Sequence, residues 1–173
     1  AWAAWRGCGL WSSDAGGGGA WDYRASEADR QLYITAARQA VIAQWLAPLQ
    51  QSALRPRVFE LTTHALALTA QAAGLADDAA LLLCHDAQWL WYSRAGESVV
   101  GSASLDITAE DVAQRSFPYA STLYGCAPSD VVLPAAFSPF SPFRLFTYQQ
   151  PPLPQQEAAF CIAAGLALRP EDC

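Results

Sequence analysis

The sequence predicts an α/β domain in which helices pack on a mixed sheet. Its 173 residues are 53% hydrophobic and 15% charged, which is enough apolar material for a core of ordinary size. Segments with the two-residue period of strands alternate with segments of helical period. Three strand patterns also follow one another between residues 79 and 104, as in a meander.

The first 20 residues differ from the rest. They combine three tryptophans with a run of glycines from Gly16 to Gly19, whose backbone freedom opposes a fixed structure. We therefore expect a poorly ordered lead-in over residues 1–20 and a folded domain over residues 21–173. The chain contains no methionine, so we expect that it does not begin at a native start.

The folded domain is expected to open with a hairpin. Two β-prone runs, WDYRA at 21–25 and QLYITAA at 31–37, flank the polar segment SEADR. Apolar residues then recur at helical spacing over 37–53, and Pro48 should kink this amphipathic helix or end its regular part. A strand is expected at 56–61.

A second helix and the meander come next. Thr62 and Thr63 are expected to cap the helix, which ends at Gly74, where a left-handed terminator is common. The meander follows, with a turn at Gly96. Its three strand patterns are AALLLCHD, AQWLWYSR and ESVVGSAS.

The last third of the chain contains two helix patterns and one strand pattern. Thr108, with Asp111 three residues later, predicts a capped short helix. The run DVVL at 130–133 predicts a strand, and six prolines over 134–154 predict an extended, loop-rich connection. Residues 157–169 are rich in small residues and apolar on most sides, which predicts a buried helix.

Charge and composition exclude several functions. Sixteen acids against ten bases give a net charge of −6, so the chain offers no basic face for direct nucleic-acid binding. All ten bases are arginine, and without lysine there is no Schiff-base nucleophile and no P-loop cation. No apolar run approaches the roughly 20 residues of a transmembrane helix, and none forms a secretion signal.

Metal and nucleophilic sites are not expected either. The five cysteines are widely spaced, so we expect reduced thiols, with Cys84 and Cys161 as small core residues. The only histidines, His64 and His85, lie at no metal-ligand spacing. No G-x-S-x-G elbow is present for serine catalysis.

A long stretch of the chain resembles a known family. QLYITAARQAVIAQWLAPLQQSALRPRVFELTTHALAL looks like the central segment of PilM-type pilus assembly proteins, in which a strand ending in two alanines and a basic residue leads into a helix. The closing AAGLALR resembles the end of the same family. AQWLWYSR and QQPPLP are closer still to its HofM branch, described as pilus assembly or DNA utilisation proteins. The resemblance runs from about Trp21 to Arg169.

This resemblance implies a partial actin-like, ribonuclease H-like fold built on two related lobes, with the amino-terminal part missing. In such proteins a nucleotide lies between phosphate loops and an adenosine loop, and several members bind ATP. The resemblance also implies a place at the cytoplasmic face of the inner membrane, where the protein docks the cytoplasmic tail of a membrane partner. We expect a non-catalytic assembly or scaffold factor. The alternative is an ATP-binding protein that needs its missing amino-terminal lobe.

Asp86 is the candidate residue for a nucleotide site. The family's second phosphate loop reads D-x-G-x-x-x-T, and here the same place reads CHDAQWLW, with Ala87 and Gln88 in place of the permissive residues. The other interpretation of Asp86 is a plain hairpin turn. The segment PAAFSPFSPF replaces the glycine-rich adenosine loop, so we expect neither a bound cofactor nor ATP hydrolysis.

Trp89 and Trp91 are the candidate residues for contact with a partner. They alternate on one face of a predicted strand, with Leu90 and Tyr92 on the other. An exposed pair of tryptophans would favour a protein partner. The alternative is that helices cover both faces of this strand.

Overall fold

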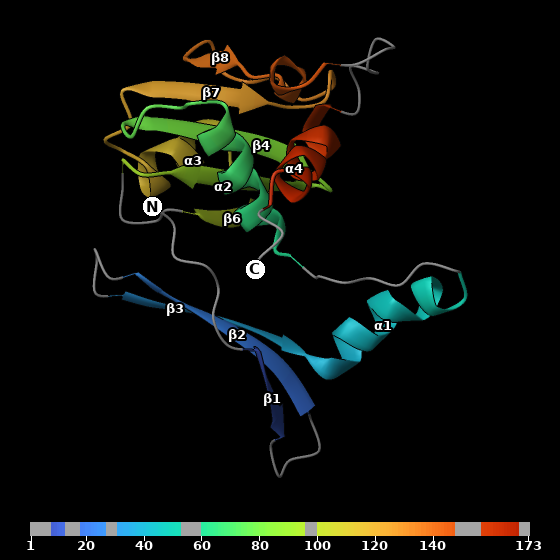
Figure 1. Cartoon of the computed structure of the whole chain (residues 1–173). Helices are drawn as coiled ribbons and strands as arrows, with labels where there is room; N and C mark the ends of the chain where they lie inside the picture. The colour runs from blue at the N-terminus through green and yellow to red at the C-terminus, as the bar shows by residue number, and fades with distance from the viewer. Residues whose placement is uncertain are drawn as a thin grey trace. The chain divides into compact units, whose positions relative to one another are not determined.

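Two units make up the chain, and each has a sheet of its own (Figure 1). The computed structural model describes residues 8–12, 18–26, 31–52, 60–95, 100–147 and 157–169. Unit 1 comprises residues 1–59 with 170–173, and unit 2 comprises Glu60–Arg169. The boundary at residues 59 and 60 differs from the expected division at residue 20.

Unit 1 contains a three-stranded antiparallel sheet. Its strands are β1 (Cys8–Ser12), β2 (Gly18–Ser26) and β3 (Gln31–Arg38), in that spatial order. The β2–β3 hairpin confirms the two runs predicted at 21–25 and 31–37.

Strand β1 and the start of β2 fall within residues 1–20, where we expected a poorly ordered lead-in. Gly18 pairs with Ser12, and Gly19 pairs with both Trp11 and Arg38. Glycine enters this sheet because ladder hydrogen bonds use only the backbone, and a partner strand on each side supplies them.

Helix α1 (Gln39–Gln50) follows β3 directly and confirms the helix predicted over 37–53 with shorter bounds. Pro48 lies inside it and lacks the N–H that would bond to the Gln44 carbonyl, and the helix ends two residues later. The strand expected at 56–61 lies mostly outside the described residues. Glu60 and Leu61, its last two residues, are not in a strand.

Unit 2 is built on a mixed five-stranded sheet, which confirms the predicted α/β class. Its strands are β4 (Ala79–His85), β5 (Gln88–Ser93), β6 (Val100–Ser104), β7 (Thr122–Cys126) and β8 (Phe137–Pro139). The spatial order is β6-β5-β4-β7-β8. Strands β4, β5 and β6 form the expected antiparallel meander, while β7 runs parallel to β4 and β8 parallel to β7.

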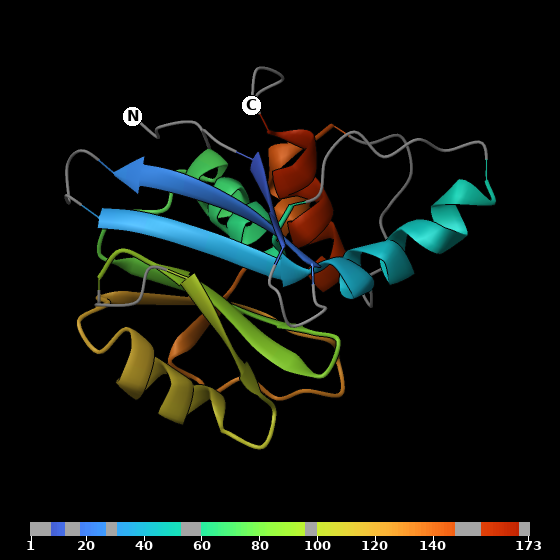
Figure 2. The same ribbon diagram turned by 90° about the horizontal axis from the view of Figure 1, so that it is seen from below.

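Helices cover both faces of this sheet (Figure 2). They are α2 (Thr62–Ala72), α3 (Ala109–Ser116) and α4 (Glu157–Ala167), and a 3-10 turn, η1 (Pro142–Leu145), precedes α4. Leu81 and Leu83 pack toward α2 and α4, whereas Leu82 packs toward α3. Because successive strand residues face opposite sides, a strand covered on both faces reads as the unbroken apolar run AALLLC.

Helices α2 and α4 approach each other through small residues. A Cβ atom added at Gly165 would overlap the backbone of Ala65, so only glycine allows this approach. The buried hydroxyl of Thr69 donates a hydrogen bond to the carbonyl oxygen of Cys161 at 2.5 Å. These contacts fix α4 against α2. They therefore also fix the position of the first turn of α4.

The predicted helix ends are partly right. The Thr108 side chain accepts a hydrogen bond from the Asp111 N–H at 3.1 Å, as expected of a capping residue. Gly74 has a φ of +68° just after α2 and confirms the predicted terminator. The predicted cap of α2 is wrong: Thr62 already has helical geometry, Leu61 is the capping residue, and no side chain caps this helix.

The strand predicted at 130–133 is also wrong. Val132 is 89% exposed, and the Val131 N–H donates to the Pro128 carbonyl in a turn, so this segment has no partner strand. The strand is instead β7, TLYGC, whose glycine weakens its local β signal but which pairs along β4. Of the connection expected over 134–154, the described part up to residue 147 contains β8 and η1.

Helix α4 is buried on one face only, contrary to the fully buried helix expected at 157–169. Cys161 and Ile162 lie in the core, whereas Phe160 is 40% exposed and Leu166 is 48% exposed. Apolar residues on the outer face of α4 therefore contact solvent, which the composition of the segment could not reveal. Within the described residues, no helix has the length and apolar character that crossing a membrane requires.

Candidate functional site

A cleft of about 410 Å³ opens at one edge of the unit 2 sheet. We call it the carboxyl-edge cleft. Its lining residues are Cys84, His85, Asp86, Ala87, Leu105, Pro128, Asp130, Val131, Ala158 and Ala159. Most of them follow the carboxyl ends of β4, β6 and β7, which run in one direction, and the last two lie in the first turn of α4.

The position of the cleft in the sheet is typical of ligand sites. Strand β4 is central: the chain continues from it to β5 and β6 on one side and returns to β7 and β8 on the other. In open α/β sheets, ligands bind outside the carboxyl ends of strands at such a reversal of strand order. The sheet therefore identifies this cleft as the candidate functional site.

Asp86 lies in the tight turn between β4 and β5. Asp86 and Ala87 have φ values of +48° and +57°, as in a two-residue type I′ hairpin turn. The Asp86 side chain is 88% exposed, and its Oδ2 lies 3.3 Å from Nε2 of His85. Aspartate tolerates the left-handed conformation, so the turn interpretation of Asp86 agrees with the structure. The same residue also lines the cleft.

The carboxyl-edge cleft is acidic. Asp86 and Asp130 contribute two carboxylates to its lining, and no arginine is among the lining residues. Glu157 begins α4 beside the cleft residues Ala158 and Ala159, and its Oε1 accepts a hydrogen bond from Ser141 at 3.1 Å. Bare phosphate groups would be repelled here, whereas a cation would be attracted.

The thiol of Cys84, which lines the cleft, is held in its protonated form. Burial, and then the nearby Asp130 and Cys126, raise the pKa of the Cys84 thiol. A hydrogen bond with Cys126, together with burial, raises the pKa of Cys161 as well. The protonated form of both thiols is therefore favoured at neutral pH. Cys84 and Cys161 are buried and free, which confirms them as small core residues.

Trp89 and Trp91 are buried, with exposed fractions of 4% and 8%. The Trp89 indole N–H donates to the Ile107 carbonyl at 2.8 Å, and the Trp91 ring occupies the space that a side chain at Gly101 would need. The two tryptophans pack beneath α3. The structure confirms the alternative, in which helices cover both faces of this strand. Trp89 and Trp91 therefore form no exposed surface for a partner.

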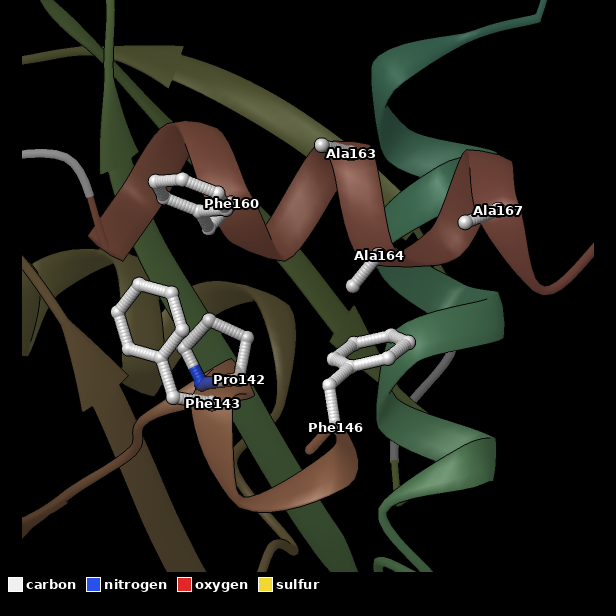
Figure 3. Close-up of a pocket in the computed structure, with 7 residues that line it drawn as sticks. All are labelled: Pro142, Phe143, Phe146, Phe160, Ala163, Ala164 and Ala167. Atoms are coloured by element: carbon white, nitrogen blue, oxygen red, sulfur yellow. The ribbon is translucent and has the colours of Figure 1, made fainter. Parts of the chain in front are cut away.

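A second hollow, the apolar groove, lies between η1 and α4 (Figure 3). It measures about 200 Å³ and is lined by Pro142, Phe143, Phe146, Phe160, Ala163, Ala164 and Ala167. The rings of Phe143 and Phe160 are in contact, with centroids 4.8 Å apart and planes tilted by 59°. Sequence reasoning missed this groove, although the phenylalanines of PFRLF stand out in a proline-rich connection.

A cluster of charged groups, which we call the clasp, joins the first and last residues of unit 2 and contains none of the cleft residues. It consists of Glu60, His64 and Arg169. Nδ1 of His64 lies 2.9 Å from Oε1 of Glu60, and Nε of Arg169 lies 3.6 Å from Oε2 of Glu60. Burial acts to raise the pKa of Glu60, but His64, the Leu61 N–H and Arg169 together outweigh it and hold that pKa below its ordinary value. His64 thus pairs with a residue four positions earlier in the chain. No three His, Cys, Asp or Glu side chains in the described ranges are grouped so as to hold a metal ion.

Comparisons with protein-family models, with curated proteins and with solved structures found no match to this chain. The class of the protein is therefore described by its fold and its site alone. It is an α/β protein whose mixed sheet has an acidic cleft at the carboxyl ends of its strands.

Proposed function

We propose that this protein is a non-catalytic assembly or scaffold factor of a type IV pilus-like or DNA-uptake machine. It would act at the cytoplasmic face of the inner membrane, where it binds the cytoplasmic tail of a membrane-anchored partner. The proposal starts from the resemblance to PilM-type and HofM-type proteins over residues 21–169.

The topology of unit 2 supports the actin-like part of this proposal. An antiparallel meander is followed by strands parallel to its first strand, in the order 3-2-1-4-5, as in ribonuclease H-like sheets. Unit 1 also contains a three-stranded meander followed by a helix, β1 to α1, the order that β4 to α3 repeats in unit 2.

The composition of the carboxyl-edge cleft is the observation that carries the scaffold function. Phosphate sites use glycine-rich loops that bring several backbone N–H groups to the anion, together with a cation. Here a two-residue turn, Asp86 and Ala87, takes the place of such a loop, and carboxylates replace the cation. Two like unit charges about 4 Å apart repel each other by about 1 kcal/mol in bulk water and by about 4 kcal/mol near a protein surface, so exposed carboxylates oppose phosphate binding, with an energy nearer the lower figure.

Magnesium–ATP binding is the second candidate function. It is favoured by Asp86, a carboxylate directly after the central strand β4 that suits a Mg²⁺ ion bound to phosphates. In this alternative a second lobe would supply the remaining nucleotide contacts.

Calorimetric titration with magnesium–ATP separates the two functions. We expect no saturable heat in the micromolar range for the scaffold. Saturable binding that weakens in Asp86→Ala, but not in Asp77→Ala at the opposite end of β4, would refute the scaffold function and support the alternative.

The partner is tested with synthetic cytoplasmic tails of inner-membrane pilus assembly proteins. Fluorescence anisotropy of each labelled tail should show saturable binding to the full chain for at least one tail. A scrambled tail of the same composition is the control. If the full chain bound each native tail no more tightly than its scrambled version, this result would contradict a docking role.

A further inference from the structure

We propose that two copies of this chain associate through the outer face of α4. This inference goes beyond the proposed function and does not depend on it. The outer face consists of the five residues on the solvent side of the helix: Ala159, Phe160, Ala163, Leu166 and Ala167. The occupant is the same face of a second copy, placed antiparallel across a two-fold axis at Ala163.

The outer face is apolar along the whole length of α4. All five of its residues are exposed, and the two bulky ones, Phe160 and Leu166, are 40% and 48% exposed. A helix that covers a core with one side usually carries charged and polar residues on the other. In α4 the only charged residue is Glu157, at its first position. Burial of the outer face against another apolar surface is therefore favourable.

The exposed apolar surface continues on both sides of the outer face. Phe146 follows η1, is 39% exposed, and lines the apolar groove together with Phe160. Leu168 follows α4 and is also 39% exposed. Figure 3 shows Ala163 on the side of α4 away from Phe146, where a second helix can approach it. A helix laid on the outer face therefore meets apolar side chains over its full width.

The outer face is complementary to a copy of itself. In an antiparallel pair with Ala163 on the axis, Phe160 of one copy lies against Ala167 of the second copy. In the same way, Leu166 of one copy lies against Ala159 of the second copy. Each bulky side chain thus meets a small one. The alanine at the centre lets the two helices approach to about 8 Å, the short end of the usual range of distances between helix axes.

The charges around α4 suit two identical partners. The whole chain carries a net charge of −6, which opposes contact between most of its surfaces. In α4, in η1 and in the ion pair that follows α4, acids and bases balance: they are Glu157, Arg144, Arg169 and Glu60. An antiparallel pair also places opposite ends of the two helix dipoles together, whereas a parallel pair would bring the two Glu157 carboxylates to the same end.

The size of the face predicts a weak dimer. A standard interface buries about 800 Å² on each partner and involves about 20–30 residues a side. The outer face has five residues, and Phe146 and Leu168 extend it. Self-association is therefore expected at the weak end, with a Kd of roughly 10–100 μM.

Analytical ultracentrifugation of the full chain with a reducing agent measures this association. The average mass should rise from one chain toward two between about 1 and about 300 μM. Ala163→Glu sets two carboxylates against each other at the axis and should raise the Kd at least about tenfold. Ala43→Glu is the matched control, because Ala43 is an exposed alanine inside helix α1, and it should leave the Kd unchanged. Urea unfolding checks that both variants are folded.

Two cysteine variants test the antiparallel orientation. With oxidised glutathione as the oxidant, Ala163→Cys should form a dimer linked through the new thiols, which meet at the axis. Ala159→Cys should not, because residue 159 lies one helical turn away and its two copies are about 12 Å apart, beyond the roughly 7 Å between Cα atoms that a disulfide spans. Peptide mass spectrometry distinguishes these links from disulfides of the chain's own cysteines.

Four outcomes would overturn the inference. A chain that stays monomeric at every concentration would show that something other than a second copy covers the outer face. A dimer that persists in Ala163→Glu, or that is weakened equally by Ala43→Glu, would place the contact elsewhere. Cross-linking of Ala159→Cys as readily as Ala163→Cys would contradict the antiparallel pair.

Discussion

The substitution Ala87→Gly should stabilise unit 2 through the turn between β4 and β5. Ala87 has a φ of +57°, and this left-handed conformation costs a residue with a Cβ atom roughly 1–2 kcal/mol. Glycine avoids that cost but gains freedom in the unfolded chain, which lowers stability by about 0.4–1 kcal/mol. Ala87 is exposed, so no core packing is lost. We expect the free energy of unfolding to rise by about 0.5–1 kcal/mol.

Urea unfolding followed by tryptophan fluorescence measures this change, since Trp89 and Trp91 are buried in unit 2. The midpoint should move to higher urea with an unchanged slope. Ala113→Gly, inside helix α3, is the control of opposite sign and should lose about 1 kcal/mol. A destabilised Ala87→Gly variant would refute the reasoning, because the alanine side chain would then contribute more than the backbone conformation costs.

Three further changes probe the interior of unit 2. Gly165→Ala should destabilise it by about 1–3 kcal/mol in urea unfolding, because the new methyl group overlaps the backbone of Ala65; unchanged stability would contradict this helix contact. Trp89→Phe should cost about 1–3 kcal/mol in the same assay, since the Ile107 carbonyl loses its donor. The ionised Glu60 contributes stability that is fully present above its ordinary pKa of 4.5 and is lost as the pH falls through its lower pKa in the folded protein. The stability difference between the wild type and Glu60→Gln, measured from pH 7 downward, should therefore shrink below about pH 4.5; a constant difference would contradict the clasp.

Short sequence patterns correctly predicted the elements that depend only on neighbouring residues. The β4–β5–β6 meander and the capped helix α3 depend on apolar alternation and on one threonine, all visible in short windows. Strand β7 was missed because its β signal is weak, and its pairing with β4 joins segments about 40 residues apart. The exposed face of α4 was missed for a related reason: composition shows that a helix is apolar, but only packing shows which side is covered.

The candidate site was predictable only in part. Asp86 could be identified from its place directly after a strand. Asp130 was placed in a strand that does not exist, and the first turn of α4 had no visible connection to either residue. The parallel pairing of β4 with β7 brings Asp86 and Asp130 to one end of the sheet, and the packing of α4 on α2 places the first turn of α4 beside them. That pairing is a long-range property, which no short window of the sequence contains.

The outermost strand β8 has a consequence for the behaviour of the protein in concentrated solution. An unpaired border strand is a template on which foreign chains can assemble into fibrils. Strand β8 spans only Phe137–Pro139, and its last residue lacks an amide hydrogen. This border therefore offers an incoming chain too few donors to add a further strand, so the proline at its end protects unit 2 against aggregation from that side.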